Sequence, residues 1–171
     1  FSISIFAQKN WVGFTSDSPS LPDVVIVEQN AEKVILDITI QGMYVTDVVE
    51  NDATFQGLEL IPFQTSKDIG RPELPMISEV IGIPGNKLVN VEILEMESQK
   101  LDNYVVYPFQ TPTTDNPGGF DHEFVMDKQF YSQSKNYPGR QVYIDGTGIW
   151  RDVKVASLHV IPFNYNAVDK E

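Results

Sequence analysis

Two prolines separated by two residues, Pro72 and Pro75, constrain the middle of the chain more than any other feature. Each proline fixes its own φ angle, removes a backbone donor and holds the preceding residue in extended geometry, so residues 70–75 cannot form a helix. Gly70 lets the backbone turn freely into the segment. We therefore expect an extended, rigid crossing piece that leads into a sheet over residues 76–84.

The rest of the chain consists of short β-rich runs without a sustained 3.6-residue period. The clearest run is 33–41, in which Val34, Leu36 and Ile38 alternate with other residues and share one face. Such runs, separated by glycine and proline, predict an all-β, sandwich-like (jelly-roll-like) single domain with long loops. The runs expected to form strands are 24–27, which we expect to be buried, 33–41, 43–49, 54–63, 80–83, 87–96, 103–109, 141–144 and 152–163.

Two details of this pattern can be tested directly. Residues 80–83 and 87–96 are predicted to pair as a hairpin around the turn 84–86. The apolar residues of its second strand that we expect to face inward are Val89, Val91 and Ile93.

The second detail concerns the last predicted strand. Val155 and Leu158 have opposite parity within 152–163, although both are apolar. An extra residue near Ala156 would place them on one face, so we expect a β-bulge there.

We expect the chain to divide into an irregular lead-in over residues 1–22 and the β-sandwich domain over 23–171. Turn-forming residues dominate 15–20 and indicate a loop. Residues 1–7 are apolar and end in alanine, so they fit either the remnant of a signal peptide or a first strand.

The composition excludes several classes of function. The 171 residues carry a formal net charge of −12, which argues against binding to nucleic acid or to an anionic membrane surface, since both require lysine and arginine. The absence of cysteine excludes disulfides, thiol catalysis and cysteine-ligated zinc. No apolar run is long enough to cross a membrane.

Catalytic and metal-binding motifs are also missing from the sequence. There is no phosphate-binding loop, dinucleotide fingerprint or nucleophile elbow. His122 stands beside Asp121 and Glu123 in a long loop over 111–123, but successive side chains of an extended segment alternate and cannot all face one ion. We favour a solvated acidic loop over a calcium or zinc site completed by Asp115 and Asn116. We expect no cofactor and no catalytic residue.

The order of several weak motifs is more specific than any one of them. Residues 70–75 are followed by Ile83-Pro84, by 89–93 and by 107–112, and then by Tyr131, 137–139 and 153–166. This succession resembles the N-terminal propeptide of gingipain-type cysteine peptidases, the family C25 propeptide. The resemblance covers roughly residues 70–166.

The resemblance implies a β-sandwich prodomain of a protein exported by a bacterium of the Bacteroidetes group and located outside the cell or on its surface. A cysteine peptidase domain would follow in the same precursor, and the prodomain would assist its folding and block its cleft. Because gingipain-type clefts favour a basic side chain, the implied inhibitory residue is one of Lys128, Lys135 and Arg140. Arg71 is a poorer candidate, because the neighbouring prolines predict that it is anchored.

Two other interpretations remain open. A carbohydrate-binding or adhesion module on an exported protein would share the β-sandwich and would display a row of exposed aromatic side chains. The aromatic candidates for such a row are Trp11, Trp150, Tyr104, Tyr107, Tyr131 and Tyr143. A small hydrolase would need His122 or His159 to meet an acid and a nucleophile in a pocket.

Overall fold

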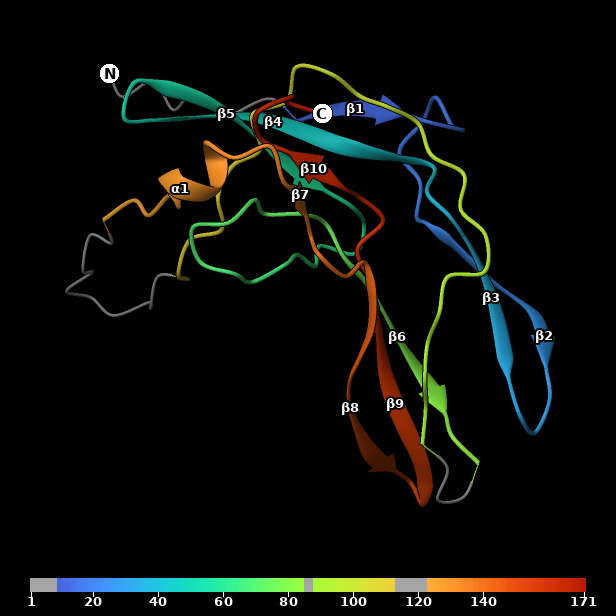
Figure 1. Ribbon diagram of the computed structural model, residues 1–171. Coiled ribbons are helices and arrows are strands. Elements are labelled where there is room, and N and C mark those ends of the chain that lie inside the picture. The colour runs from blue at the N-terminus through green and yellow to red at the C-terminus, as the bar shows by residue number, and fades with distance from the viewer. Residues whose placement is uncertain (1–8, 85–87, 113–122) are drawn as a thin grey trace, which may run out of the picture.

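The computed structural model describes residues 9–84, 88–112 and 123–171 (Figure 1). Short β-branched and aromatic runs bounded by glycine, proline and asparagine form strands, and the expected all-β class is confirmed. The elements are β1 (Asn10–Gly13), β2 (Asp23–Gln29), β3 (Val34–Thr39), β4 (Gly42–Glu50), β5 (Ala53–Glu59), β6 (Ile77–Gly82), α1 (Lys128–Tyr131), β7 (Asn136–Tyr137), β8 (Val142–Trp150), β9 (Val153–Val160) and β10 (Tyr165–Asn166).

The strands pair antiparallel in four small sheets. Sheet β1-β4-β5 and the short pair β10-β7 form one body with α1, whereas sheet β6-β9-β8 and hairpin β2-β3 project from it as two arms (Figure 1). Within the expected irregular lead-in, β1 pairs with β4, so that expectation is corrected for residues 10–13. The possible signal remnant at 1–7 lies outside the described residues.

Two hairpins close through two-residue turns. Asn51 and Asp52 have φ angles of 49° and 62° between β4 and β5, and Arg151 and Asp152 have 47° and 66° between β8 and β9. Positive φ at both central residues is the type I′ pattern, whose twist matches that of the flanking strands. Asparagine and aspartate tolerate this conformation, whereas Arg151 adopts it against its preference.

The core lies between sheet β1-β4-β5 and the proline-rich segment after β5. Leu74 is completely buried, and Pro72, Pro75 and Pro108 are among the largest fully buried side chains. The other members of the buried apolar cluster are Met43, Leu58, Leu60, Met76, Ile77, Val106, Phe130, Tyr137, Ile161, Tyr165 and Ala167. The core therefore joins residues from β4, β5, β6, α1, β7 and β10 with the segments between them.

The expected rigid crossing piece is confirmed, and we call residues 64–76 the crosspiece. Ser66 holds it closed: its backbone N–H donates to the Leu74 carbonyl at 2.8 Å, and its hydroxyl accepts from Leu74 N–H at 3.0 Å and donates to the Pro72 carbonyl at 3.1 Å. A bridge also joins Pro72 to Pro108. The buried polar groups of the crosspiece thus find partners although two prolines cannot donate.

The predicted hairpin over 80–83 and 87–96 is wrong. β6 forms as expected but pairs with β9, and residues 88–100 belong to no strand. Val89 and Ile93 do not face inward, since they are 37% and 49% exposed, whereas Val91 is half-buried. The alternating pattern correctly indicated extended geometry, but local periodicity does not identify a pairing partner.

Three smaller predictions are also corrected. Residues 103–109 make only isolated bridges, such as Val106 with Gln56, instead of a strand. The run 24–27 forms part of β2, but Val25, Ile26 and Val27 are more than half exposed instead of buried. The bulge faces the expected region but lies in β8, between Ile144 and Thr147, and not in β9.

Replacing Leu74 tests the role of the crosspiece. Leu74→Ala removes a side chain that is 0% exposed and should lower the free energy of unfolding by about 2–5 kcal/mol. The matched control is Leu88→Ala, at a side chain that is 98% exposed, which should change it by less than about 0.5 kcal/mol. Urea unfolding measures both, and equal effects would contradict a core centred on the crosspiece.

Candidate functional site: the neck of the long loop

Hydrogen bonds join the two segments that flank the long loop, and we call these segments, residues 108–110 and 124–127, the neck. The Gln110 side chain donates to the Val125 carbonyl at 2.8 Å and accepts from Val125 N–H at 2.9 Å. It also donates to the Pro108 carbonyl at 2.8 Å. These reciprocal bonds hold together two residues 15 positions apart, as a strand pair would. Residues 113–122, with the proposed ligands Asp115, Asn116, Asp121 and His122, lie outside the described residues.

Asp127 fixes the returning side of the neck to the crosspiece. Its N–H donates to the Gly70 carbonyl at 3.0 Å, and its carboxylate accepts from Phe130 N–H at 2.8 Å as the N-cap of α1. The second carboxylate oxygen lies 3.2 Å from the Arg71 guanidinium, which stacks 4.5 Å from the centre of the Phe130 ring. The expectation that Arg71 is anchored is confirmed.

Gly70 is required at this junction for two reasons. Its φ of +75° lies in the left-handed region, which side chains disfavour. A Cβ at this position would also stand 3.1 Å from the backbone nitrogen of Asp127. The glycine therefore permits the close approach of two segments that are 57 residues apart in the sequence.

Aromatic side chains support the neck from the sheet. Phe124 packs against Phe55 and Tyr107 with ring centres 5.7 and 5.8 Å away, and Phe55 and Tyr107 meet edge to face. Phe55 comes from β5, so the loop is braced against the main sheet as well as the crosspiece.

Burial shifts the pKa of two ionisable side chains, one in the crosspiece and one that contacts it. Burial raises the pKa of Glu73, whose carboxylate accepts a hydrogen bond from the Thr65 hydroxyl at 3.0 Å. Burial also raises the pKa of Tyr137 to about 12, and the Tyr137 hydroxyl donates to Asp68 at 2.9 Å. Burial is the largest cause of both shifts, so they follow mainly from packing.

The three candidate inhibitory residues lie in three different places. Lys128 opens α1, one residue after the Asp127 anchor, and is exposed. Lys135 is exposed just before β7. Arg140 is exposed in the turn before β8, and its Nε donates to the Val142 carbonyl at 3.0 Å. The structure does not bring them together into one site.

His159 does meet a serine and an acid. Ser78 Oγ lies 2.7 Å from Nδ1 of His159, and Asp145 Oδ2 lies 3.7 Å from Nε2. The arrangement is not a hydrolase site, because the Asp145 contact exceeds hydrogen-bonding distance and the Asp145 side chain is 75% exposed. Ser78 and His159 are directly paired across β6 and β9, and Tyr143 stacks on the imidazole ring.

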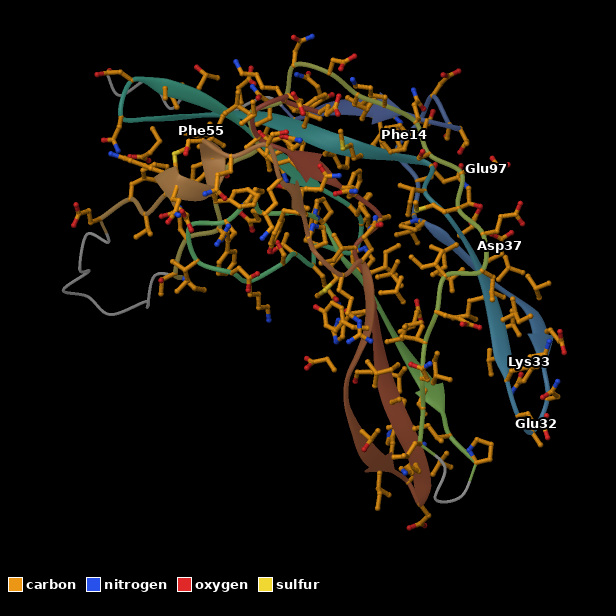
Figure 2. All side chains as sticks on the ribbon, viewed as in Figure 1. Phe14, Glu32, Lys33, Asp37, Phe55 and Glu97 are labelled. Atoms are coloured by element: carbon orange, nitrogen blue, oxygen red, sulfur yellow. The ribbon has the colours of Figure 1, made fainter. Side chains whose placement is uncertain are left out.

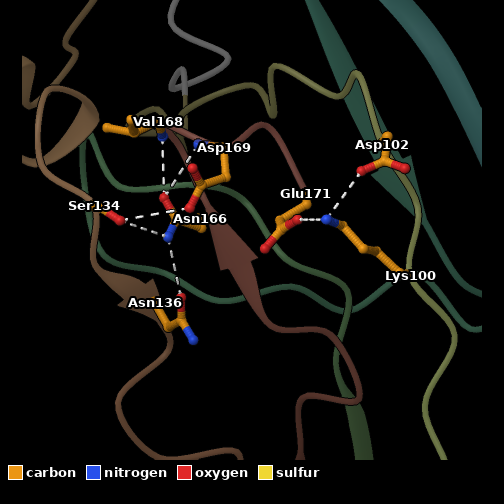
Figure 3. Close-up of polar contacts among 8 residues, drawn as sticks. All are labelled: Lys100, Asp102, Ser134, Asn136, Asn166, Val168, Asp169 and Glu171. Atoms are coloured by element: carbon orange, nitrogen blue, oxygen red, sulfur yellow. Dashed lines mark hydrogen bonds and ion pairs between the residues drawn. The ribbon is translucent and has the colours of Figure 1, made fainter.

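A polar network fixes the C-terminal segment and was missed by the sequence analysis. Asn166 is buried; its side-chain carbonyl accepts from Val168 and Asp169 N–H, and its amide donates to Ser134 and Asn136 (Figure 3). A lone asparagine in an irregular segment gives no sequence signal for such a role.

The C-terminal residues also bind residues 100–104, at the end of the segment that follows β6. Lys100 forms ion pairs with Asp102 at 3.4 Å and with Glu171 (Figure 3). Tyr104 N–H also donates to the Lys170 carbonyl at 3.1 Å.

The part of the chain that the structure describes holds neither a metal centre nor a membrane-spanning helix. Within it, no group of three or more histidine and carboxylate side chains could hold a metal ion. Within the same residues, no helix combines the length and apolar character needed to cross a membrane.

The comparisons with known proteins now decide the family. The family model Propeptide_C25 matches residues 16–171. The chain belongs to this propeptide family. The resemblance inferred from the order of the motifs is confirmed, and so is the expectation that this chain is not itself the catalytic domain.

Two curated relatives from Porphyromonas gingivalis, one of them from strain ATCC 33277, are both gingipain R1. Each is 25% identical over 154 residues, which is 87% of this chain. The match spans only 15% of one relative and 9% of the other, so the chain corresponds to a small part of their length.

Two solved structures share the fold. One, described as structural insight into zymogenic latency of gingipain K from Porphyromonas gingivalis, has a TM-score of 0.78 at 18% identity, over 95% of this chain and 91% of that one. The other, a complex of Porphyromonas gingivalis RgpB pro- and mature domains, has a TM-score of 0.76 at 19% identity, over 86% and 76%. The expected sandwich-like propeptide fold is thereby confirmed.

Replacing Gln110 tests the neck. Gln110→Ala removes both bonds to Val125 and should raise the hydrogen-exchange rate of the Val125 amide about fivefold, since one net hydrogen bond contributes about 1 kcal/mol. Global stability should fall by no more than that amount. Gln129→Ala, at an exposed glutamine of α1, is the control and should leave the Val125 amide unchanged. An unchanged rate in Gln110→Ala would show that the neck does not depend on this side chain.

The raised pKa of Tyr137 predicts a loss of stability at alkaline pH. Between pH 10 and about 12 the unfolded phenol ionises while the folded one stays protonated, so the free energy of unfolding falls as pH rises. Tyr137→Phe should make this decline shallower. Urea unfolding at several pH values between 9 and 12 measures the slope, and equal slopes in both proteins would contradict the assignment.

Proposed function

We propose that this chain is the latency and folding-assistance domain of a secreted gingipain-like cysteine peptidase, whose catalytic domain follows in the same precursor. Membership of the propeptide family carries the proposal. The relatives support it, since they are much longer than this chain and one related structure joins a pro-domain to a mature domain.

The neck is what an inhibitory loop needs at its base. A loop that fills a peptidase cleft loses conformational freedom on binding, and a rigid base lowers that entropic cost. Here Gln110 closes the neck, Asp127 ties it to Gly70 and Arg71, and Phe124 packs on the sheet. The residues at which the loop begins and ends are therefore held in fixed positions.

Of the three basic candidates, Lys128 has the position best suited to an inhibitory residue. The sequence contains no lysine or arginine between Lys100 and Lys128, so Lys128 is the first cation after the loop. It is exposed and adjacent to the Asp127 anchor. An ammonium group held there can pair with an acidic specificity pocket in the cleft.

The sugar-binding alternative receives less support. A row of exposed aromatic side chains is absent from the described residues, where Trp150 and Phe63 are the exposed large aromatics and lie in separate regions. Trp11 instead packs against Tyr44 in sheet β1-β4-β5, and Tyr143 stacks on His159. The candidate tyrosines are packed or half-buried.

Export follows from the same proposal. The relatives come from Porphyromonas gingivalis, and a peptidase kept latent by an acidic prodomain is suited to transport before activation. We propose that the precursor is exported by a bacterium of the Bacteroidetes group and acts outside the cell or on its surface.

Substitution of the basic residues in the full precursor tests the proposal. Lys128→Ala should raise the peptidase activity of the unprocessed precursor at least tenfold, because the cation that occupies the cleft is lost. Lys135→Ala and Arg140→Ala are made in parallel, and Lys67→Ala, at an exposed lysine of the crosspiece, is the control. Full activity of the unmodified, unprocessed precursor would overturn latency itself, whereas unchanged latency in all three variants would remove these residues from the inhibitory site.

A further inference from the structure

The segment that was wrongly predicted to be a hairpin strand is extended and unpaired. We call residues 88–99 the strap. In Figure 1 it runs from the far end of the β6-β9-β8 arm back to the body, along the side that faces hairpin β2-β3. No hydrogen bond or ion pair joins it to any other part of the described chain.

The sequence of the strap is that of a strand. Val89, Val91 and Ile93 recur at every second position, and glycine and proline are absent from 88–99. Its apolar side chains other than the half-buried Val91 are nevertheless open to solvent: Leu88 is 98%, Leu94 67% and Met96 61% exposed. Isolated apolar residues at a surface are ordinary, but a whole strand-forming run without a strand partner is not.

Contacts at both ends hold the strap extended. Ile83 N–H donates to the Lys154 carbonyl at 2.7 Å before it, and Tyr104 N–H donates to the Lys170 carbonyl after it. Lys100 adds its ion pairs with Asp102 and Glu171 at the second end. Because the chain is already stretched between fixed points, pairing with another strand would cost it less conformational entropy than a free peptide would lose.

We propose that residues 88–97 are a β-augmentation site, at which the strap pairs through its backbone with an exposed edge strand of the peptidase domain of the same precursor. The choice of partner rests on the proposed function. The unused backbone donors and acceptors supply the pairing, and the alternating apolar side chains supply contacts to the partner's surface.

Charge selects this partner over a second copy of the chain. The strap carries Glu92, Glu95 and Glu97 and no lysine or arginine, and Figure 2 also labels Asp37, Glu32 and Lys33 on the neighbouring hairpin β2-β3, where Lys33 pairs with Glu28. Two straps placed edge to edge would oppose like charges, which destabilises strand pairs. The partner strand should therefore carry apolar side chains together with lysine or arginine.

Hydrogen exchange on the unprocessed precursor provides the first test. If the strap pairs with the peptidase domain, every second amide, on the edge that faces the partner, should exchange at least 100-fold more slowly than reference rates for unstructured peptides, although these amides have no partner within the described prodomain. Reference-like exchange in a precursor that is latent would overturn the strap proposal and leave the proposed function standing. A precursor that is active without processing would instead overturn the proposed function.

Neighbouring proline substitutions provide the second test, because successive N–H groups of a strand point to opposite edges. Ile93→Pro and Leu94→Pro each remove one N–H that makes no bond in the described chain, so neither should lower the stability of the prodomain. Only the proline whose missing N–H would face the partner should weaken latency, which means that the peptidase activity of the unprocessed precursor rises about tenfold or more. Ile93→Ala and Leu94→Ala measure the loss of the side chain alone. Equal effects of the two prolines, or none, would overturn the proposal.

Discussion

The structure depends on satisfying the backbone of a segment that contains two prolines and lies inside the core. Pro72 and Pro75 cannot donate hydrogen bonds, so residues 64–76 cannot be a regular sheet strand. The Ser66 hydroxyl solves this locally by serving both the Pro72 carbonyl and Leu74 N–H. With its polar groups paired, the crosspiece can bury Leu74 completely and still offer the Gly70 carbonyl and the Arg71 guanidinium to the neck.

What the sequence predicted well is local in origin. Proline restricts its own residue and the one before it, so the rigidity of the crosspiece and the anchoring of Arg71 could be inferred without a partner. The alternation over 33–41 likewise predicted β3, since a side-chain period of two is a property of one strand. The order of such motifs was enough to indicate the propeptide family, which the family model confirms.

What the sequence did not predict depends on contacts between distant residues. The partner of β6 is β9, and Ser78 lies opposite His159, 81 positions away. The neck needs Gln110 to reach Val125, and an isolated glutamine has no periodicity to reveal it. The type I′ turn at Arg151 and Asp152 was hidden for another reason: arginine is an unusual residue for positive φ, so the twist of the paired strands overrides local preference there.

The contrast between neck and strap is consistent with the proposed function. A domain that folds by itself and also binds a partner needs some groups that are left available to that partner. The polar groups of the neck are paired within the chain, so the two ends of the long loop are fixed. The backbone of the strap makes no hydrogen bond in the described chain, and most of its side chains are exposed. A strand prediction that fails because the described residues offer no partner is therefore informative, since the pattern that misled the hairpin assignment is the one a second protein strand would recognise.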